Sequence, residues 1–289
     1  IISDYLNRQN LAVLRVDDRG AGETKTKPSE LKYTTADRIT DVQSYIQFIR
    51  DSIGSKHPIY LLGHSEGARI AAEVAVKDTQ VKKIIALGPA LVNGAIINKY
   101  QNTNSLKKIL RDSEYINAYF TLHDSIIGNS TELLSGRLKP SQIDSCIVNQ
   151  LNQWKKCTPK NQSKKVKKKF EKVIKTDFDT YILHQYSQLL SNHWMLFFLQ
   201  DDPIKWWTEI QQPSLLINGE LDRQTPVELN KPVFDKYLSH KKNITYKTIG
   251  GINHIGQKAQ TGHPSEYTEI TTTVDSSVLG LIGTFFLED

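Results

Sequence analysis

Short apolar runs alternate with longer stretches of helical periodicity along much of this chain. A segment such as 59–62 is continuously apolar, as a strand buried on both faces of a parallel sheet should be. Residues 35–51 instead place Ile39, Val42, Ile46 and Ile49 on one face, which predicts a helix. The pattern predicts an α/β fold with helices on both faces of a mostly parallel sheet. The expected strands are residues 11–16, 59–62, 81–88, 213–219 and 244–250.

The region between the third and fourth expected strands has a different composition. Residues 96–206 are rich in Asn, Gln, Lys and aromatic side chains, and their periodicity is helical throughout. This is too long for an ordinary crossover, so we expect a helical cap over the carboxyl ends of the strands, where α/β folds bind ligands. Residues 1–95 and 207–289 would then form the core. Aromatic clusters of the cap could line an acyl pocket or simply build its own core.

A glycine-flanked serine follows the second expected strand. Gly63-His64-Ser65-Glu66-Gly67 fits G-x-S-x-G, and helical periodicity continues from Glu66 to Lys77. In such a turn the serine backbone is strained and its hydroxyl stands clear of its neighbours. We expect side chains at both flanking glycines to collide as strand and helix close. Ser65 is therefore the candidate nucleophile, and an ordinary strand-to-helix turn is the alternative.

A serine nucleophile needs a base, and the base needs an orienting acid. Asp222 follows the fourth expected strand and His254 follows the fifth. Because parallel strands end at the same edge of a sheet, both should lie near Ser65, in the order serine, acid, histidine. Glu220 is the rival acid and His263 the rival base. We expect His64 to point away from the serine hydroxyl.

These residues predict acyl transfer. His254 would take the Ser65 proton, Asp222 would stabilise the imidazolium, and water would later hydrolyse the acyl-enzyme. The backbone N–H of Glu66, at the positive end of the helix that begins there, is the expected oxyanion donor. A second donor normally comes from a loop marked His-Gly, and this dipeptide does not occur in the sequence.

The net charge of +6 is concentrated in one segment. Residues 155–175 contain ten lysines and one acid, Glu171. Apolar residues at helical spacing make these lysines the solvated side of an amphipathic helix, or a surface for acidic partners or anionic lipid. No recognised motif accompanies them, so nucleic-acid binding is not expected. The sequence contains no run of 18 apolar residues, so no membrane span is predicted.

Cys146 and Cys157 lack metal-ligand spacing, and no metal site is predicted. They could be free thiols or form one local bridge.

With these motifs in place, the chain resembles the bacterial α/β-hydrolase carboxylesterases of the EstD type, a group also called serine aminopeptidase-like hydrolases. The resemblance covers nearly the whole chain and implies the α/β-hydrolase fold, Ser65, Asp222 and His254 as the triad, and hydrolysis of short to medium acyl esters without a cofactor. It is carried by LAVLRVDDRGAG (11–22), TTAD (34–37), GHSEG (63–67), WMLFFLQDDP (194–203), LLINGELD (215–222), NH (253–254) and the segments TG (261–262) and EY (266–267).

The sequence departs from the family at two points. Ala68 follows the serine turn where the family usually repeats glycine. The family also has further residues before the equivalent of Ile1, including the His-Gly loop and the strand that lies between the first two strands expected here. We therefore expect a fragment of a longer esterase, whose sheet would have a gap at that place.

Two other functions remain open. The same triad could cleave aminoacyl or peptide bonds, which would call for a carboxylate such as Glu114 or Asp124 to hold a free amino terminus. A non-catalytic hydrolase-like protein could instead use the cap pocket to bind a ligand.

Overall fold

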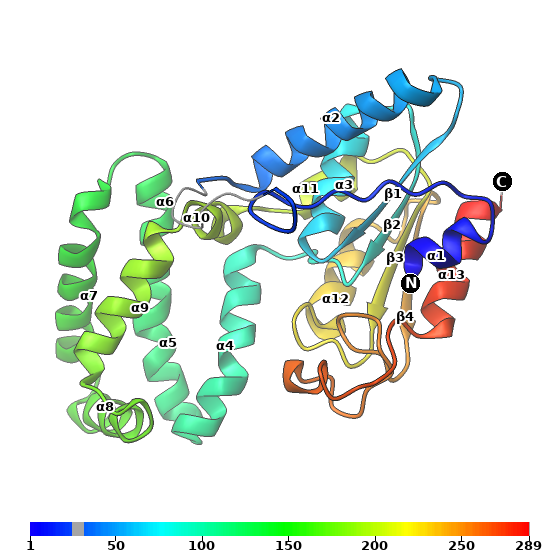
Figure 1. Cartoon of the computed structure of the whole chain (residues 1–289). Helices are drawn as coiled ribbons and strands as arrows, with labels where there is room; N and C mark the ends of the chain where they lie inside the picture. Colours follow the sequence, from blue (N-terminus) through cyan, green and yellow to red (C-terminus); the bar gives the residue numbers. More distant parts are fainter. Residues whose placement is uncertain (25–31, 289) are drawn as a thin grey trace. The chain divides into compact units, whose positions relative to one another are not determined.

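The structure of the chain, a computed structural model, describes residues 1–24 and 32–288 and divides into two compact units. The first unit, called here the sheet unit, comprises Ile1–Val92 and Asp202–Asp289. The second, called the helical unit, comprises Asn93–Asp201. The elements of the sheet unit, shown in Figure 1, are α1 (Ile2–Asn7), α2 (Thr35–Ile53), β1 (Ile59–His64), α3 (Glu66–Lys77), β2 (Val81–Leu87), α11 (Ile204–Glu209), β3 (Ser214–Gly219), α12 (Val227–Tyr237), β4 (Ile244–Ile249), the 3₁₀ turn η3 (Pro264–Glu266) and α13 (Ser276–Leu287).

The four strands form one parallel sheet in the order β1-β2-β3-β4, as predicted for these segments. The register pairs Leu61 with Ile84 between β1 and β2, and Ile85 with Leu215 between β2 and β3. Every residue of β3 is buried, whereas in β4 at the edge of the sheet only Ile244 is buried and the other residues are half-buried or exposed. Buried central strands explain the continuous apolar runs in the sequence.

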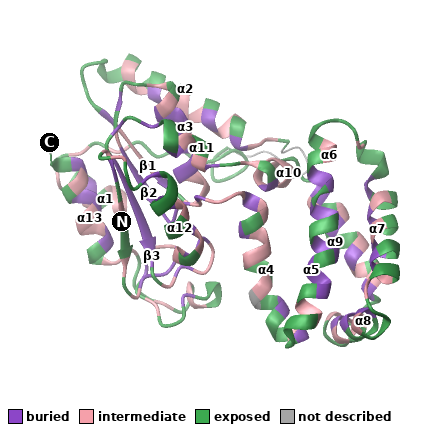
Figure 2. Ribbon diagram, turned by 180° about the vertical axis from the view of Figure 1, so that it is seen from behind, coloured by how far each residue is buried: buried purple, intermediate pink, exposed green. Residues whose placement is uncertain are grey.

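Helices cover both faces of the sheet (Figures 1 and 2). On one face α2, α3, α11 and α12 contribute to a core that contains Ile39, Ala72 and Trp207. On the other face α1 and α13 pack against the strands through Leu6 and Ile282. This layered arrangement confirms the α/β prediction.

The prediction of a strand at residues 11–16 is wrong. The segment belongs to no strand of the described sheet, and Leu14 and Val16 are each 45% exposed. Leu11 and Val13 still pack against the core on the α13 face. The physical reason is the lack of a neighbour, since β1 is an edge strand among the described residues and no ladder of hydrogen bonds reaches this segment.

Four helices of the helical unit begin at polar caps. The side chains of Asn93, Asp112, Asp177 and Asn192 each accept a hydrogen bond from a backbone N–H in the first turn of the helix that follows. Apolar residues at helical spacing then meet in one core, which includes Leu122, Phe170 and Ile182. The elements are α4 (Gly94–Leu110), α5 (Ser113–Ile127), α6 (Asn129–Leu134), η2 (Pro140–Gln142), α7 (Ile143–Cys157), α8 (Lys160–Ile174), α9 (Phe178–Ser191) and α10 (His193–Gln200).

The aromatic residues of this unit mostly build its own core. Tyr119 stacks on Phe170 with ring centroids 5.0 Å apart, and Trp154 lies 5.8 Å from Phe178. The indole N–H of Trp154 donates to the carbonyl of Ala118 at 2.7 Å, so its polar atom is satisfied inside the core. Of the two possibilities for the aromatic clusters, these contacts favour the core.

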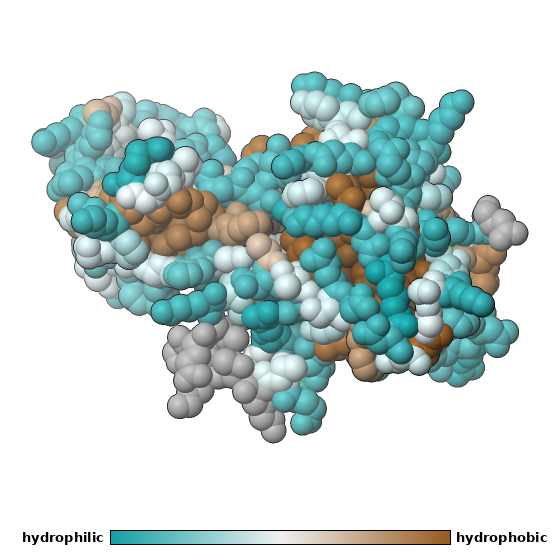
Figure 3. Space-filling model, turned by 90° about the horizontal axis from the view of Figure 1, so that it is seen from above, coloured by the Kyte–Doolittle hydropathy of each residue, from teal (hydrophilic) through white to brown (hydrophobic). Residues whose placement is uncertain are grey.

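The surface is mainly hydrophilic in the view from above, with hydrophobic residues showing in patches between polar ones (Figure 3). Phe48 on α2, 62% exposed, is among the large apolar residues at the surface. Cys146 and Cys157 are free thiols. Among the described residues, no helix combines the length and apolar character needed to cross a bilayer.

Candidate active site

Ser65 lies on the sharp turn between β1 and α3. Its backbone has φ 54° and ψ −116°, a conformation that residues with a side chain rarely adopt. Its N–H donates to the carbonyl of Leu87 at 2.8 Å, which extends the β1-β2 ladder up to the serine. The strained turn predicted from G-x-S-x-G is thus confirmed.

The two glycines beside Ser65 differ in what their neighbours allow. A Cβ on Gly63 would lie 2.1 Å from the carbonyl oxygen of Gly67, so no side chain fits there. A Cβ on Gly67 would meet no described atom within 4 Å, apart from its own helix backbone and chain neighbours. The prediction that both positions exclude a side chain is therefore wrong for Gly67, because its Cβ position points into open space.

Asp222 and His254 lie together at the carboxyl ends of β3 and β4. Asp222 Oδ2 is 2.8 Å from His254 Nδ1, and the two residues are only 1% and 5% exposed. Because a carboxylate only accepts hydrogen bonds, this contact places a proton on Nδ1 and leaves Nε2 as the lone-pair nitrogen of neutral His254. That tautomer is the one a general base needs.

Asp222 is held by further donors from its own loop. The backbone N–H groups of Gln224 and Thr225 each donate to Oδ1 at 2.8 Å. The Asn218 amide reaches Oδ2 at 3.2 Å, and the Thr225 hydroxyl lies 2.9 Å from the same oxygen. These donors fix the orientation of the carboxylate toward His254.

Two further polar residues, which the sequence-based prediction did not include, support this loop through Asn218. Asn230, fully buried, accepts from the Leu91 N–H at 2.9 Å and donates to the Asn218 amide oxygen at 2.8 Å. The Tyr246 hydroxyl donates to the same Asn218 oxygen at 2.7 Å, and burial raises the pKa of this phenol so that it keeps its proton. The available signal was Asn218 itself, a polar residue that directly follows the apolar run Leu215–Ile217 in β3.

His254 is also fixed from the side of the serine turn. His64 Nε2 donates to the His254 carbonyl at 2.9 Å, and the centroids of the two imidazole rings lie 4.6 Å apart. Gly88, which follows β2, has φ +51°, and a Cβ there would lie 2.9 Å from His254 Nδ1. The loop after β2 therefore leaves space for the His254 ring only because residue 88 is glycine.

Among the described residues, the structure joins Asp222 to His254 by a hydrogen bond but records none between the Ser65 hydroxyl and His254. Catalytic hydrogen bonds are often long or absent before substrate binds.

Glu66 is the first residue of α3, so its N–H lies at the positive end of the helix dipole. Its side chain is directed toward α2, where it accepts from the Thr35 hydroxyl at 2.6 Å and pairs with Arg38.

The rival acid and base have structural partners. Glu220 Oε2 accepts from the Gly251 N–H at 2.9 Å and so ties the loops after β3 and β4 together. His263 Nδ1 bonds the Ser265 hydroxyl at 2.9 Å at the start of η3 and is exposed. The hydrogen bond between Asp222 and His254 favours these two residues over the rivals.

An apolar cavity of about 260 Å³ adjoins His254 within the sheet unit. Its walls come from the carboxyl ends of the strands, the loop after β4 and the first turn of α13. The lining residues are Ile2, Leu62, His64, Leu87, Gly88, Ile217, Gly219, Ile252, Asn253, His254, Ile255, Gly256, Val274 and Val278.

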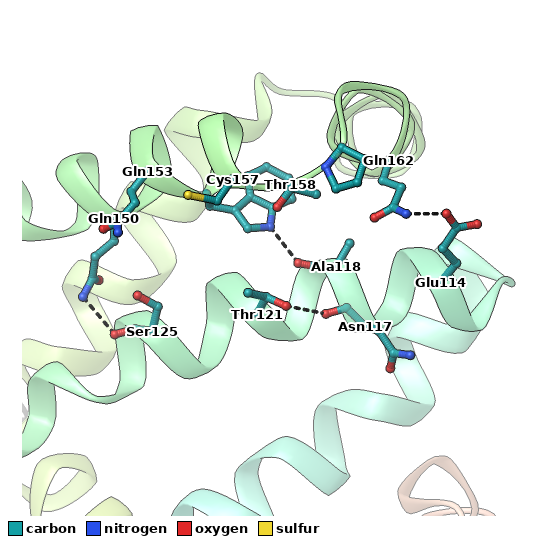
Figure 4. Close-up of a pocket in the computed structure, with 12 residues that line it drawn as sticks. Glu114, Asn117, Ala118, Thr121, Ser125, Gln150, Gln153, Cys157, Thr158 and Gln162 are labelled. Carbon is teal, nitrogen blue, oxygen red and sulfur yellow. Dashed lines mark hydrogen bonds between the residues drawn. The ribbon is translucent and has the colours of Figure 1, made fainter.

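The two carboxylates considered for an amino-terminus site lie in the helical unit. Asp124 pairs with Lys99 at 2.6 Å, which offsets its charge. Glu114 bonds Gln162 at the rim of a groove of about 500 Å³ between α5, α7 and the start of α8 (Figure 4). Side chains with amide or hydroxyl groups, such as Asn117 and Thr121, line this groove together with apolar ones such as Trp154.

Comparison with known proteins identifies the family. The sequence profile of the Hydrolase_4 family, described as serine aminopeptidase, S33, matches residues 2–254. No curated protein matches the chain.

Several solved structures are similar in chain trace. MGS-M2, an alpha/beta hydrolase enzyme from a Medee basin deep-sea metagenome library, is 16% identical with a TM-score of 0.44, over 90% of this chain and 74% of that one. The esterase Pf2001 of Pyrococcus furiosus is 11% identical with a TM-score of 0.41, over 87% of this chain and 61% of that one. An alpha-beta serine hydrolase homologue from Coxiella burnetii is 13% identical with a TM-score of 0.42, over 88% and 65%.

The profile match covers most of the chain, including the serine turn, the acid loop and the histidine loop, and it agrees with the parallel sheet and its flanking helices. The chain therefore belongs to the serine aminopeptidase, S33, family and has the α/β-hydrolase fold.

Proposed function

We propose that the protein is a serine hydrolase that cleaves carboxylic esters through an acyl-enzyme. The observation that carries this proposal is the buried hydrogen bond of 2.8 Å between Asp222 and His254, formed beside the strained turn that presents Ser65. Burying this pair costs free energy, because both polar groups give up their contacts with water. It is also the pair that a serine nucleophile requires.

In the proposed mechanism His254 Nε2 takes the Ser65 proton as Oγ attacks the acyl carbonyl. The Asp222 carboxylate stabilises the imidazolium that results, and the loop donors hold that carboxylate in place. Negative charge develops on the carbonyl oxygen, where the Glu66 N–H at the start of α3 would stabilise it. His254 returns its proton to the leaving alcohol, and it then activates the water that hydrolyses the acyl-enzyme.

The cavity beside His254 supports a small acyl group. Its volume of about 260 Å³ and its apolar walls fit a short hydrocarbon chain better than a long one. We expect p-nitrophenyl acetate and butyrate to be hydrolysed with a higher kcat/KM than the palmitate ester. A preference for palmitate would count against this cavity as the acyl site.

Cleavage of aminoacyl or peptide bonds is the second candidate, supported by the family's description as serine aminopeptidase. Comparing p-nitrophenyl acyl esters with aminoacyl p-nitroanilides separates the two functions, with Ser65→Ala as the control for turnover that does not depend on the site. We expect faster turnover of the esters. Faster turnover of the anilides, abolished by Ser65→Ala, would replace the ester proposal with the aminopeptidase one.

A further inference from the structure

One side of α8 carries an uninterrupted row of exposed lysines. Ser163, Val166 and Phe170 lie buried in the core of the helical unit, where α8 packs against α4, α5 and α9 (Figure 2). The exposed lysines recur mainly at intervals of three and four residues and share the opposite side of the helix. We call this set the lysine face: Lys160, Lys164, Lys165, Lys168, Lys172 and Lys175.

Three other lysines in this region have partners inside the helical unit. Lys155 and Lys167 both pair with Asp179 on α9. Lys169 donates to the Leu110 carbonyl and lies over the Tyr115 ring at 4.7 Å. The role of these three is structural, and they are not part of the lysine face.

The members of the lysine face have no such partners in the described part of the chain, where no carboxylate lies within 4 Å of their ammonium groups. The one acid on α8, Glu171, accepts from the Phe178 N–H at 3.2 Å, so it is directed toward the start of α9. Like charges four residues apart, as at Lys160, Lys164 and Lys168, destabilise a helix. An anionic surface would attract each of these ammonium groups and so offset their mutual repulsion.

The positive charge belongs to the helical unit rather than to the whole protein. Residues 93–201 contain 16 Lys and Arg against 9 Asp and Glu, whereas the rest of the chain contains 21 against 22. The net charge of +6 therefore arises in this unit. The lysine face spans about 18 Å between Lys160 and Lys172 along one straight helix.

The composition of the face distinguishes between possible anionic partners. All six members are lysines, which act as point charges and lack the fork of arginine that reads phosphates and base edges. The only aromatic residue of α8, Phe170, is 2% exposed, so the helix offers no ring for bases to stack on. A row of four to eight lysines on an amphipathic helix is the pattern that anionic lipid headgroups attract.

We propose that the lysine face of α8 binds the surface of bilayers containing anionic phospholipids. The binding is electrostatic and peripheral, because the apolar side of α8 is already buried in the helical unit. It is independent of the proposed catalytic residues, all of which lie in the sheet unit.

Vesicle flotation with the full chain tests the proposal. Vesicles of phosphatidylcholine alone are compared with vesicles containing about 30% phosphatidylserine at about 0.1 M NaCl, within the range where surface charges still interact. The face variant carries Lys160→Gln, Lys164→Gln, Lys168→Gln and Lys172→Gln. The control variant changes four exposed lysines of the sheet unit, with the same loss of charge: Lys82→Gln, Lys236→Gln, Lys242→Gln and Lys247→Gln.

We expect the unmodified chain to float with phosphatidylserine vesicles and not with phosphatidylcholine alone. The face variant should lower the partition coefficient by about two orders of magnitude or more, and the control variant by less than about threefold. About 0.5 M NaCl should release the protein. If the face variant does not fold, Lys164→Gln with Lys168→Gln should lower the partition coefficient by about tenfold or more.

Three results would overturn the proposal. The first is equal binding of the unmodified chain to both kinds of vesicle, including no binding to either. The second is equal loss of binding in the face and control variants, which would indicate net charge rather than this surface. The third is tighter binding to mixed-sequence duplex DNA than to phosphatidylserine vesicles at the same salt, which would make the partner a nucleic acid.

Discussion

Gly88 links the backbone of the sheet to the geometry of the proposed catalytic pair. It follows β2 with φ +51°, and an added Cβ would lie 2.9 Å from His254 Nδ1 and 3.3 Å from Asp222 Oδ2. Ordinary contact begins at about 3.4 Å, so Gly88→Ala must move the His254 ring by about 0.5 Å. A displacement of 1 Å costs about 100-fold in rate, so we expect this half-ångström shift to cost about tenfold.

The same substitution has a separate effect on stability. An alanine held at positive φ costs about 1–2 kcal/mol, wherever it lies. Gly136→Ala is the matched control, because Gly136 has φ +72° and no described atom within 4 Å of its Cβ position. Both variants should lose free energy of unfolding in urea, Gly88→Ala at least as much as Gly136→Ala, while only Gly88→Ala should react more slowly with a fluorophosphonate.

The assay is the second-order rate of fluorophosphonate labelling, followed by gel fluorescence at concentrations well below saturation. Gly88→Ala should label about ten times more slowly than the unmodified chain, and Gly136→Ala should label at an unchanged rate. Equal rates for all three proteins would refute the reasoning that Gly88 sets the position of His254.

Three further predictions concern buried polar groups. Asp222→Asn offers an amide N–H to His254 Nδ1 and so drives the imidazole proton onto Nε2. The rate of fluorophosphonate labelling should fall by about 10³–10⁴-fold. A loss below tenfold would contradict the assigned tautomer. Asn230→Ala leaves the Leu91 N–H and the Pro89 carbonyl without their hydrogen-bond partner. The free energy of unfolding in urea should therefore fall by about 3 kcal/mol. A loss below about 1 kcal/mol would show that water replaces the amide. Burial lowers the pKa of His123 from 6.5 to about 4, so the unfolded chain takes up a proton at this residue before the folded chain does as pH falls. The free energy of unfolding should therefore drop by about 3 kcal/mol between pH 6.5 and 4. His123→Gln should remove that part of the pH dependence. An unchanged pH profile in His123→Gln would contradict the last prediction.

The sheet and the serine turn could be predicted because their signals are local. Strands β2, β3 and β4 were expected within one residue of their ends. In β3 the run Leu215–Ile217 reports burial on both faces. The helix after Ser65 was expected from Glu66 to Lys77, which are the bounds of α3. The apolar run at residues 11–16 has the composition expected of a strand. A strand also needs a hydrogen-bonded neighbour, and the sequence pattern does not reveal whether one is present.

Long-range polar contacts were the part of the site that could not be predicted. The loops that contain Asp222 and His254 follow from parallel topology, because successive strands end at one edge. The roles of Asn230 and Tyr246 depend on side chains meeting across 12 and 28 positions of sequence from Asn218. The space for a side chain at Gly67 likewise depends on where the surrounding atoms lie, which the motif alone does not specify.

The central claim is that Ser65 is a nucleophile activated by His254 and Asp222. The most direct measurement is mass-spectrometric identification of the residue labelled by a fluorophosphonate, in the unmodified chain and in Ser65→Ala. We expect one adduct, on Ser65, which disappears in Ser65→Ala even though that variant unfolds at the same urea concentration. A folded chain without the Ser65 adduct, or with labelling that survives in Ser65→Ala, would contradict the claim.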